Sequence, residues 1–522
     1  SLSVLLGQSM EKTEAKITTV NSVSAAPTLS QTVNWPKGNA IGSSNYTAST
    51  LMSYFSRLDY SFKQKYLLGA SIRTDGSSKF GKANRWGVFP SISAGWNFHK
   101  EDIFSNISWL SSGKIRGSYG MSGTTWDNNY LALGIMDGGE LDRYSSLLQI
   151  SYGGISGFTP TWFDGFKNDN LTWVKTTMGN IGVDLSLFNG RVEVIFDAYE
   201  KLTKGLLLST ALPTTSGYNE VYRNAADVLN RGLEFTVNTN MNFGSNFSWN
   251  TSLNFAYNKN RVIRLPDGNA DIVKVSTSGQ DFGSIVRTGA PLNGFFFYES
   301  QGIYQAESQI PVDPKTGKRL VGLQNKKLEV GDRNFKDQNG DYRIDVTDRV
   351  YSGDPNSKWT GGWTNDFIYK GFSLNLVSTF VIGRSIVNTV LLERLRLGKG
   401  FAGSSLPNFD NYAIWEKSGD NARYPTLNPW GSASQIVNYD SEYLEDGSYF
   451  KIKSATLSYS FNKDVIPRLP FERVRVYCTA DNLVTFQKYS GPDAELVTID
   501  GFDLSKGYPM RRMLLFGLSL SL

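Results

Sequence analysis

Residues 337–348 have the types and spacing that could hold a calcium ion. Oxygen donors fall at positions 1, 3, 5, 7, 9 and 12 of this segment: Asp337, Asn339, Asp341, the carbonyl of Arg343, Asp345 and Asp348. Hard oxygen ligands at such spacing surround Ca²⁺ in EF-hand loops. Two features depart from that pattern, because the glycine, Gly340, stands at position 4 instead of 6 and position 12 is Asp instead of Glu. The alternative is an acidic turn whose Asp and Asn side chains bond their own backbone.

Aromatic residues are the second candidate, because sugar rings stack well on exposed aromatic faces. They gather in two segments that lack a strand pattern, 122–177 and 381–448. The substrate-binding candidates are Trp126, Tyr130, Tyr144, Trp162, Trp415 and Trp430. The alternative is that these rings pack the loops together or contact a partner protein.

The composition argues against catalysis and against nucleic-acid binding. His99 and Cys478 are the only residues of their types, which excludes zinc clusters and Cys/His nucleophilic pairs. No acidic pair stands in a context that would raise one pKa for acid–base work. The net charge of +5 is spread along the chain without a basic block. We therefore expect no enzyme, no required cofactor and no nucleic-acid partner, with a structural Ca²⁺ at 337–348 as a candidate.

Most of the remaining sequence consists of segments of about ten residues in which apolar and polar residues alternate. The last segment shows the pattern clearly, since Leu514, Phe516, Leu518 and Leu520 alternate with residues that include Gly517 and Ser519. A two-residue period places apolar side chains on one face of a strand. About 14 such segments can be counted, and no run approaches the roughly 18 apolar residues of a spanning helix. This pattern predicts an all-β fold, a transmembrane antiparallel β-barrel.

Short and long connections alternate along the chain, as they do in outer-membrane barrels with short periplasmic turns and long extracellular loops. Short turns are predicted at 63–65, 188–191, 243–247 and 370–371. The long excursions are 9–50, 122–177, 200–230, 259–360, 381–448 and 481–508. Residues 1–522 are therefore treated as one barrel domain with long extracellular loops. Within one of these loops, residues 381–397 are predicted to form a short helix.

Several segments, in order along the chain, resemble the SusC/RagA family of TonB-dependent outer-membrane transporters of Bacteroidetes. They include "KIRGSYGMSG" (114–123), "NRGLEF" (230–235) and "EDGSYFKIKSATLSYSF" (445–461). The resemblance implies a barrel of about 22 strands around an N-terminal plug. Nothing here resembles the plug or the first strands, so the chain is expected to be the C-terminal part of the barrel.

The resemblance also implies a function and partners. It implies TonB-dependent import of oligosaccharides or peptides across the outer membrane of a Gram-negative bacterium. Substrate would be captured between the barrel loops and a SusD-like surface lipoprotein, in pairs that can dimerise within outer-membrane lipid. The TonB complex would act through the missing plug region. The competing interpretations are a passive outer-membrane channel formed by this chain alone and a soluble all-β domain.

Overall fold

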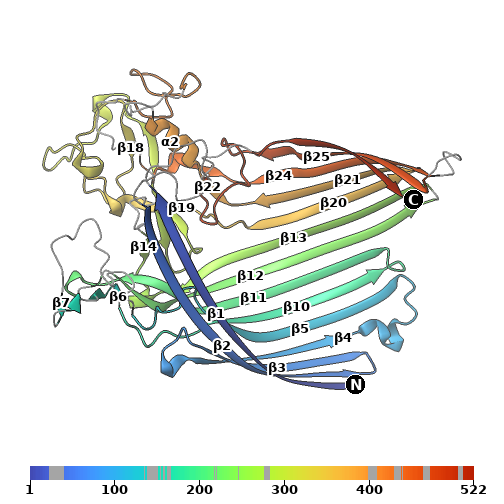
Figure 1. Cartoon of the computed structure of the whole chain (residues 1–522). Helices are drawn as coiled ribbons and strands as arrows, with labels where there is room; N and C mark the ends of the chain where they lie inside the picture. Colours follow the sequence, from blue (N-terminus) through green and yellow to red (C-terminus); the bar gives the residue numbers. More distant parts are fainter. Residues whose placement is uncertain are drawn as a thin grey trace. The chain divides into compact units, whose positions relative to one another are not determined.

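The computed structural model describes residues 1–22, 40–134, 136–137, 151–152, 155–156, 159–160, 166–216, 218, 220–244, 246–274, 283–397, 408–427, 437, 439–462, 471–503 and 510–521. Its main element is one sheet of fourteen strands, in the order β1-β2-β3-β4-β5-β10-β11-β12-β13-β20-β21-β24-β25-β26 (Figure 1). Strands that follow one another within this sheet are also neighbours in it, which is the up-and-down order of membrane barrels. The predicted number of strands is confirmed.

The strands of this sheet are β1 (Leu2–Ser22), β2 (Ala40–Phe62), β3 (Tyr66–Ser77), β4 (Trp86–Trp96), β5 (Leu110–Thr124), β10 (Val174–Leu187), β11 (Val192–Ala211), β12 (Glu220–Phe243), β13 (Phe247–Arg264), β20 (Trp359–Tyr369), β21 (Phe372–Ile382), β24 (Tyr449–Asn462), β25 (Arg473–Gln487) and β26 (Met513–Ser521). The four predicted short turns all connect neighbouring strands. Gln64, Asn189 and Gly371 in these turns have φ of 55°, 59° and 91°, the left-handed backbone that tight hairpins require.

The strands are longer than predicted, so the predicted excursions were wrong at their ends. β1 and β2 form most of the described part of 9–50, and β11 and β12 cover 200–211 and 220–230. In each of the other four excursions, a few residues at the ends belong to strands. These strands are β5, β10, β13, β20, β21 and β25. Backbone pairing does not need apolar side chains, as Lys12 opposite Thr50 shows. The apolar pattern stops where a strand exceeds the roughly ten residues that cross a membrane.

The register places apolar side chains on one face of the sheet. Leu457 lies opposite Leu374 on one side and Cys478 on the other, and Cys478 lies opposite Phe516. This face is not covered by protein, since Leu457 and Phe516 are 53% and 77% exposed. The other face is polar, with a bond of 2.9 Å between the hydroxyls of Thr456 and Thr479. The predicted alternation is confirmed.

Two compact units can be distinguished, residues 1–101, 115–181 and 200–228, and residues 102–114, 182–199 and 229–522. The second unit contains a body of loops that we call the loop cluster, residues 283–353, 384–397, 408–427, 437, 439–446 and 488–503. Its elements are β15 (Ser284–Val286), β16 (Gly294–Tyr298), β17 (Ser300–Ile303), β18 (Arg333–Phe335), β19 (Arg349–Gly353), β22 (Ser385–Val387), α2 (Thr389–Leu397) and β23 (Leu444–Asp446). Helix α2 confirms the helix predicted within 381–397. The remaining short elements are β6 (Met136–Asp137), β7 (Ser151–Tyr152), β8 (Ile155–Ser156), β9 (Thr159–Pro160), α1 (Pro266–Asn269) and β14 (Ile272–Lys274).

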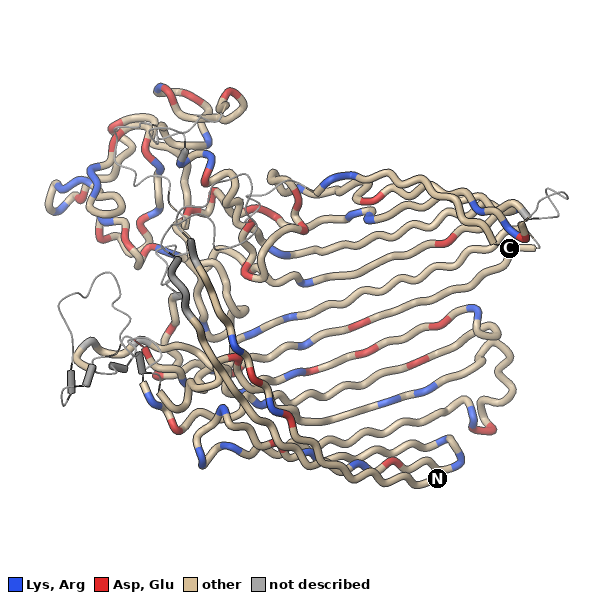
Figure 2. Tube along the Cα trace, viewed as in Figure 1, with Lys and Arg blue, Asp and Glu red and all other residues tan. Residues whose placement is uncertain are grey.

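The loop cluster has its own apolar cores. One core joins Phe295 and Phe297 of β16 to Leu392 and Leu395 of α2. A second contains Tyr304 and other residues of the segment between β16 and β19. Charged residues are frequent in the loop cluster and sparse along β20, β21 and β26 (Figure 2). Within the described part of the chain, no helix is long and apolar enough to cross a membrane.

Candidate functional site

The acidic segment 337–348 forms a tight turn whose carboxylates bond the backbone. Asp337 accepts hydrogen bonds from the amides of Gly340 and Tyr342, at 2.7 and 2.8 Å. Asp345 accepts from the amide of Thr347 at 2.9 Å, and Asp348 accepts from the amide of Asp345 at 2.9 Å. The side chains of Asp345 and Asp348 thereby form a capping box for the short 3₁₀ turn Val346–Asp348. The hydrogen bond from the Thr347 amide lowers the pKa of Asp345, whereas burial raises the pKa of Asp348.

The other two side chains of the predicted cation site are engaged in the same way. Asn339 accepts from the amide of Asp341, and Asp341 accepts from the amide of Arg343, each at 2.9 Å. These bonds are the ones that the alternative, a self-capping turn, predicts. Among the residues that the structure describes, no three or more Asp, Glu, His or Cys side chains are grouped as a metal site. Calcium binding at 337–348 stays a prediction.

The described aromatic candidates are packed against protein. Trp126 contacts Phe80 edge-on, with ring centroids 4.6 Å apart, and Tyr130 accepts a hydrogen bond from the amide of Ala48. In the loop cluster, Trp415 donates to the side-chain carbonyl of Gln305 at 3.1 Å. Tyr144, Trp162 and Trp430 lie outside the described residues. Trp126 and Trp415 belong to different units. The described rings match the packing alternative, and sugar binding by this set stays a prediction.

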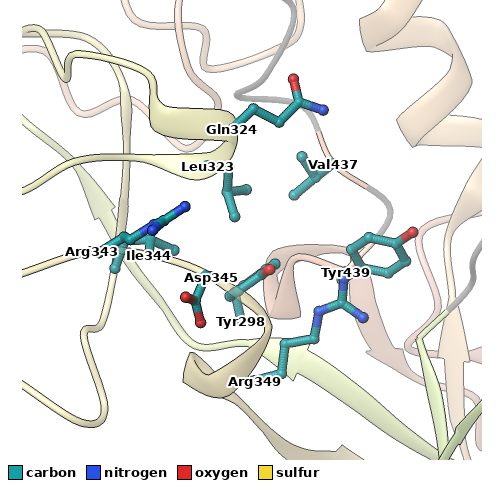
Figure 3. Close-up of a pocket in the computed structure, with 9 residues that line it drawn as sticks. All are labelled: Tyr298, Leu323, Gln324, Arg343, Ile344, Asp345, Arg349, Val437 and Tyr439. Atoms are coloured by element: carbon teal, nitrogen blue, oxygen red, sulfur yellow. The ribbon is translucent and has the colours of Figure 1, made fainter. Parts of the chain in front are cut away.

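The loop cluster contains a small, mostly apolar pocket of about 250 Å³. Leu323, Ile344 and Val437 supply apolar walls, and Figure 3 shows them around the same opening as Asp345 and Arg349. The guanidinium of Arg349 lies over the rings of Tyr439 and Tyr298, at 3.8 and 5.1 Å from their centroids. Such stacking fixes the cation in place. The remaining lining residues are Tyr298, Gln324, Arg343 and Tyr439. A pocket of this size can accept one small apolar or aromatic group.

A larger cavity of about 930 Å³ lies where the loop cluster meets the end of β13. Five segments line it, and their residues lie within 257–261, 289–291, 351–358, 383–385 and 444–446. Its cations are Lys259, Arg261, Lys358 and Arg384, and its anions are Asp354, Glu445 and Asp446. Both charge and volume suit a polar ligand of several residues.

Strand lengths create this cavity. β20 pairs with β13 only as far as Tyr257, and β13 then continues to Arg264 without β20 beside it. The amide of Asn258 still bonds the carbonyl of Lys358 at 3.0 Å. Further along, the amide of Val262 bonds the carbonyl of Ala290 at 2.8 Å, so a different segment pairs with β13 there. Residues 259–261 lie between these two contacts and line the cavity.

The sequence interpretation missed this site. It ended the strand at Tyr257 because the apolar pattern stops there. The available signal was the run Tyr-Asn-Lys-Asn-Arg at 257–261, which continues the alternation with carboxamides and long cations. A strand read past its apolar part would have placed these cations at the edge of the predicted loops.

Comparison with known proteins gives consistent results. The family model described as TonB dependent receptor-like, beta-barrel, matches residues 18–370. TonB-dependent receptor P3 of Formosa agariphila is 32% identical over 456 residues, which are 87% of this chain and 43% of that protein. TonB-dependent receptor SusC of Bacteroides thetaiotaomicron is 30% identical over 490 residues, 91% of this chain and 44% of that protein. The chain thus spans about half the length of these relatives.

The fold comparison agrees with the sequence comparison. A structure of the RagAB peptide transporter superposes with a TM-score of 0.75 at 21% identity, over 99% of this chain and 53% of that chain. At that identity the likeness shows the fold alone, an antiparallel β-barrel. Together with the fourteen-stranded sheet and the family match over 18–370, it confirms the resemblance to SusC and RagA. The chain belongs to the TonB-dependent receptor-like β-barrel family.

Proposed function

We propose that this chain forms part of the barrel of an outer-membrane importer of the SusC type. Cargo, an oligosaccharide or a peptide, is captured between the loop cluster and a SusD-like surface lipoprotein and then released inward by the TonB complex. The observation that carries the proposal is the family match over 18–370 on a sheet whose apolar face is exposed. An exposed apolar face of this extent requires a lipid environment.

The arrangement of the loops supports a capture role. The loop cluster is built from water-facing segments with their own apolar cores, so it can hold a defined shape outside the membrane. The two cavities described above, which described residues line, open in it or at its boundary with β13. Import of this kind breaks no bond in the cargo. The relatives' names describe receptors and transporters, which supports the same assignment.

Native purification tests this proposal. The gene product would be tagged at its chromosomal locus, extracted from outer membranes in mild detergent, and analysed by intact mass together with everything that co-purifies. A chain about twice as long as this one, isolated with a surface lipoprotein, supports the importer. Cargo uptake by cells should then be lost when TonB is deleted. A barrel of this chain alone, without a partner and with TonB-independent uptake, would overturn the proposal in favour of a passive channel.

A further inference from the structure

The apolar face of β13 becomes basic beyond the end of β20. Tyr257 is the last residue of β13 that pairs with β20. The face that carries Tyr257 continues with Lys259, Arg261 and Ile263, because side chains along a strand alternate between its two faces. These three residues are exposed, whereas Val262 on the other face is buried. The two cations therefore extend the exposed apolar face of the sheet.

Side-chain contacts agree with this assignment of faces. Asn258 and Asn260 both donate to the side-chain oxygen of Asn230 in β12, at 3.3 and 2.9 Å, so these residues share the polar face. Lys358 lies directly opposite Asn258, whose amide bonds its carbonyl at 3.0 Å. Directly opposite residues of an antiparallel pair point to the same face, so Lys358 belongs to the polar face. Lys259 borders the 930 Å³ cavity, but its side chain belongs to the apolar face.

The apolar face of β13 has the length that crosses a membrane. Its other end is Phe247, which lies opposite the half-exposed Tyr369. The roughly ten residues from Phe247 to Tyr257 span about 33 Å along the strand, or about 25 Å across the membrane at a tilt of about 40°. Trp359 lies opposite Tyr257 and is 39% exposed. Aromatic residues at both ends of such a band mark the two membrane–water interfaces, so Tyr257 lies at one of them.

Lys259 and Arg261 thus lie just beyond the hydrocarbon layer. They are about 5 and about 10 Å further from the membrane centre than Tyr257 at the same tilt. Because the headgroup layer is roughly 5–8 Å thick on each side, Lys259 lies within it and the long side chain of Arg261 can reach back into it. In the part of the chain that the structure describes, neither cation forms an ion pair or a side-chain hydrogen bond. Asp271, in the loop that follows β13, is paired with Arg287 at 2.7 Å. Both cations can therefore bind an anionic headgroup.

We propose that Lys259 and Arg261 bind a phosphate group of a glycolipid in the outer leaflet of the membrane, beside Tyr257. The loop cluster follows the same end of β13 and lies outside the membrane in the proposed function, so these cations meet the outer leaflet. The lipid of that leaflet in Gram-negative bacteria is a phosphorylated glycolipid, and phosphate oxygens accept charge-assisted hydrogen bonds from Arg and Lys. The proposal rests on the membrane placement in the proposed function and adds a lipid partner to it.

Native mass spectrometry of the full-length protein in a neutral detergent, with any lipoprotein that co-purifies, tests this. The probes are monophosphoryl lipid A, the same glycolipid after removal of its phosphate, and inorganic phosphate as a competitor. The phosphorylated lipid should bind about 30-fold more tightly than the dephosphorylated one, since each basic residue near a charged lipid surface contributes about fivefold. The variant Lys259→Gln/Arg261→Gln should remove most of this preference. Lys358→Gln removes a cation at the same level on the polar face and should leave the preference unchanged.

Each outcome has a defined meaning. Equal affinity for the two lipids, no binding of either, or a preference that survives Lys259→Gln/Arg261→Gln overturns the proposal. An equal loss in Lys358→Gln overturns the assigned face, and displacement of the lipid by equimolar inorganic phosphate overturns the lipid in favour of a free anion. Loss of the lipoprotein from the double variant, with lipid preference unchanged, indicates a protein contact instead. Heat-modifiable gel migration shows that each variant is folded. TonB-dependent uptake without phosphate preference leaves the importer standing and removes this site, whereas phosphate preference with TonB-independent uptake does the reverse.

Discussion

The buried ion pair between Arg333 and Asp440 holds together two distant segments of the loop cluster. The Nε of Arg333 lies 2.8 Å from Oδ2 of Asp440, and neither side chain has exposed surface. Arg333 also donates to the carbonyl of Arg423 at 2.8 Å, and Asp440 accepts from the amide of Glu442 at 2.9 Å. Removing Arg333 leaves Asp440 buried without its cation, and removing Asp440 leaves Arg333 only the carboxylate of Glu442, 3.9 Å from its Nη1. Breaking a buried pair in this way costs about 3–5 kcal/mol.

The variants Arg333→Met and Asp440→Asn should each favour opening of the loop cluster on the order of 10²–10³-fold. Asn keeps the acceptor for the Glu442 amide, so this variant removes the charge and little else. The double variant should lower the free energy of opening by clearly less than the sum of the two single variants, because neither charge then remains unpaired. Lys167→Met breaks an exposed pair with Asp169 and should cost below about 1 kcal/mol.

Native-state hydrogen exchange of the intact protein in detergent measures these costs. Peptides covering β18 and residues 439–446 report on local opening, since their amides exchange only when the loop cluster opens. The reasoning would be refuted if Arg333→Met reduced protection no more than Lys167→Met did. Additive effects in the double variant would also contradict it, because they would mean that the two charges do not stabilise one another.

Three further predictions concern pH, lipid and calcium. Hydrogen bonds from the backbone amides of Lys417 and Glu416 lower the pKa of Asp420, so the stability that its carboxylate contributes is present above its usual 3.8 and is lost as pH falls below that value. Exchange protection of residues 416–420 should therefore fall between pH 5 and pH 3, and Asp420→Asn should abolish this fall. Phe516→Arg on the apolar face should lower the free energy of unfolding, measured in urea from lipid vesicles, by about 2–4 kcal/mol. Leu515→Arg on the opposite face should lower it much less. Equal costs would contradict the assigned faces. If residues 337–348 bind calcium, the ion should slow proteolysis there relative to a chelator; identical cleavage would leave only the self-capping turn.

The sequence was sufficient for features that depend on local patterns. Alternation determined the number of strands and which face Phe516 occupies. Turn chemistry located the hairpin at Asn189. The ends of β1 and β11 could not be found in this way, because polar residues pair through the backbone as well as apolar ones do.

The candidate sites were harder to predict, for a different reason. The acidic turn was recognised from spacing, but spacing alone does not say whether Asp337 bonds a cation or the amide of Gly340. The large cavity depends on residues such as Lys259, Lys358 and Glu445, which are far apart in sequence and meet only after the loops fold. The Arg333–Asp440 pair has the same origin. Tertiary contacts of this kind leave no periodic signal.

The exposed apolar face of the sheet and the buried cores of the loop cluster have a thermodynamic consequence. Unfolding of the loop cluster exposes Phe295, Leu392 and Tyr304 to water and so raises the heat capacity. When the loop cluster opens alone, Leu457 and Phe516 on the sheet remain in lipid, so they contribute nothing to that change. The heat-capacity increment of this local opening should therefore come from the buried cores of the loop cluster alone. Cooling should weaken the water-facing loops while the lipid-facing strands stay in place.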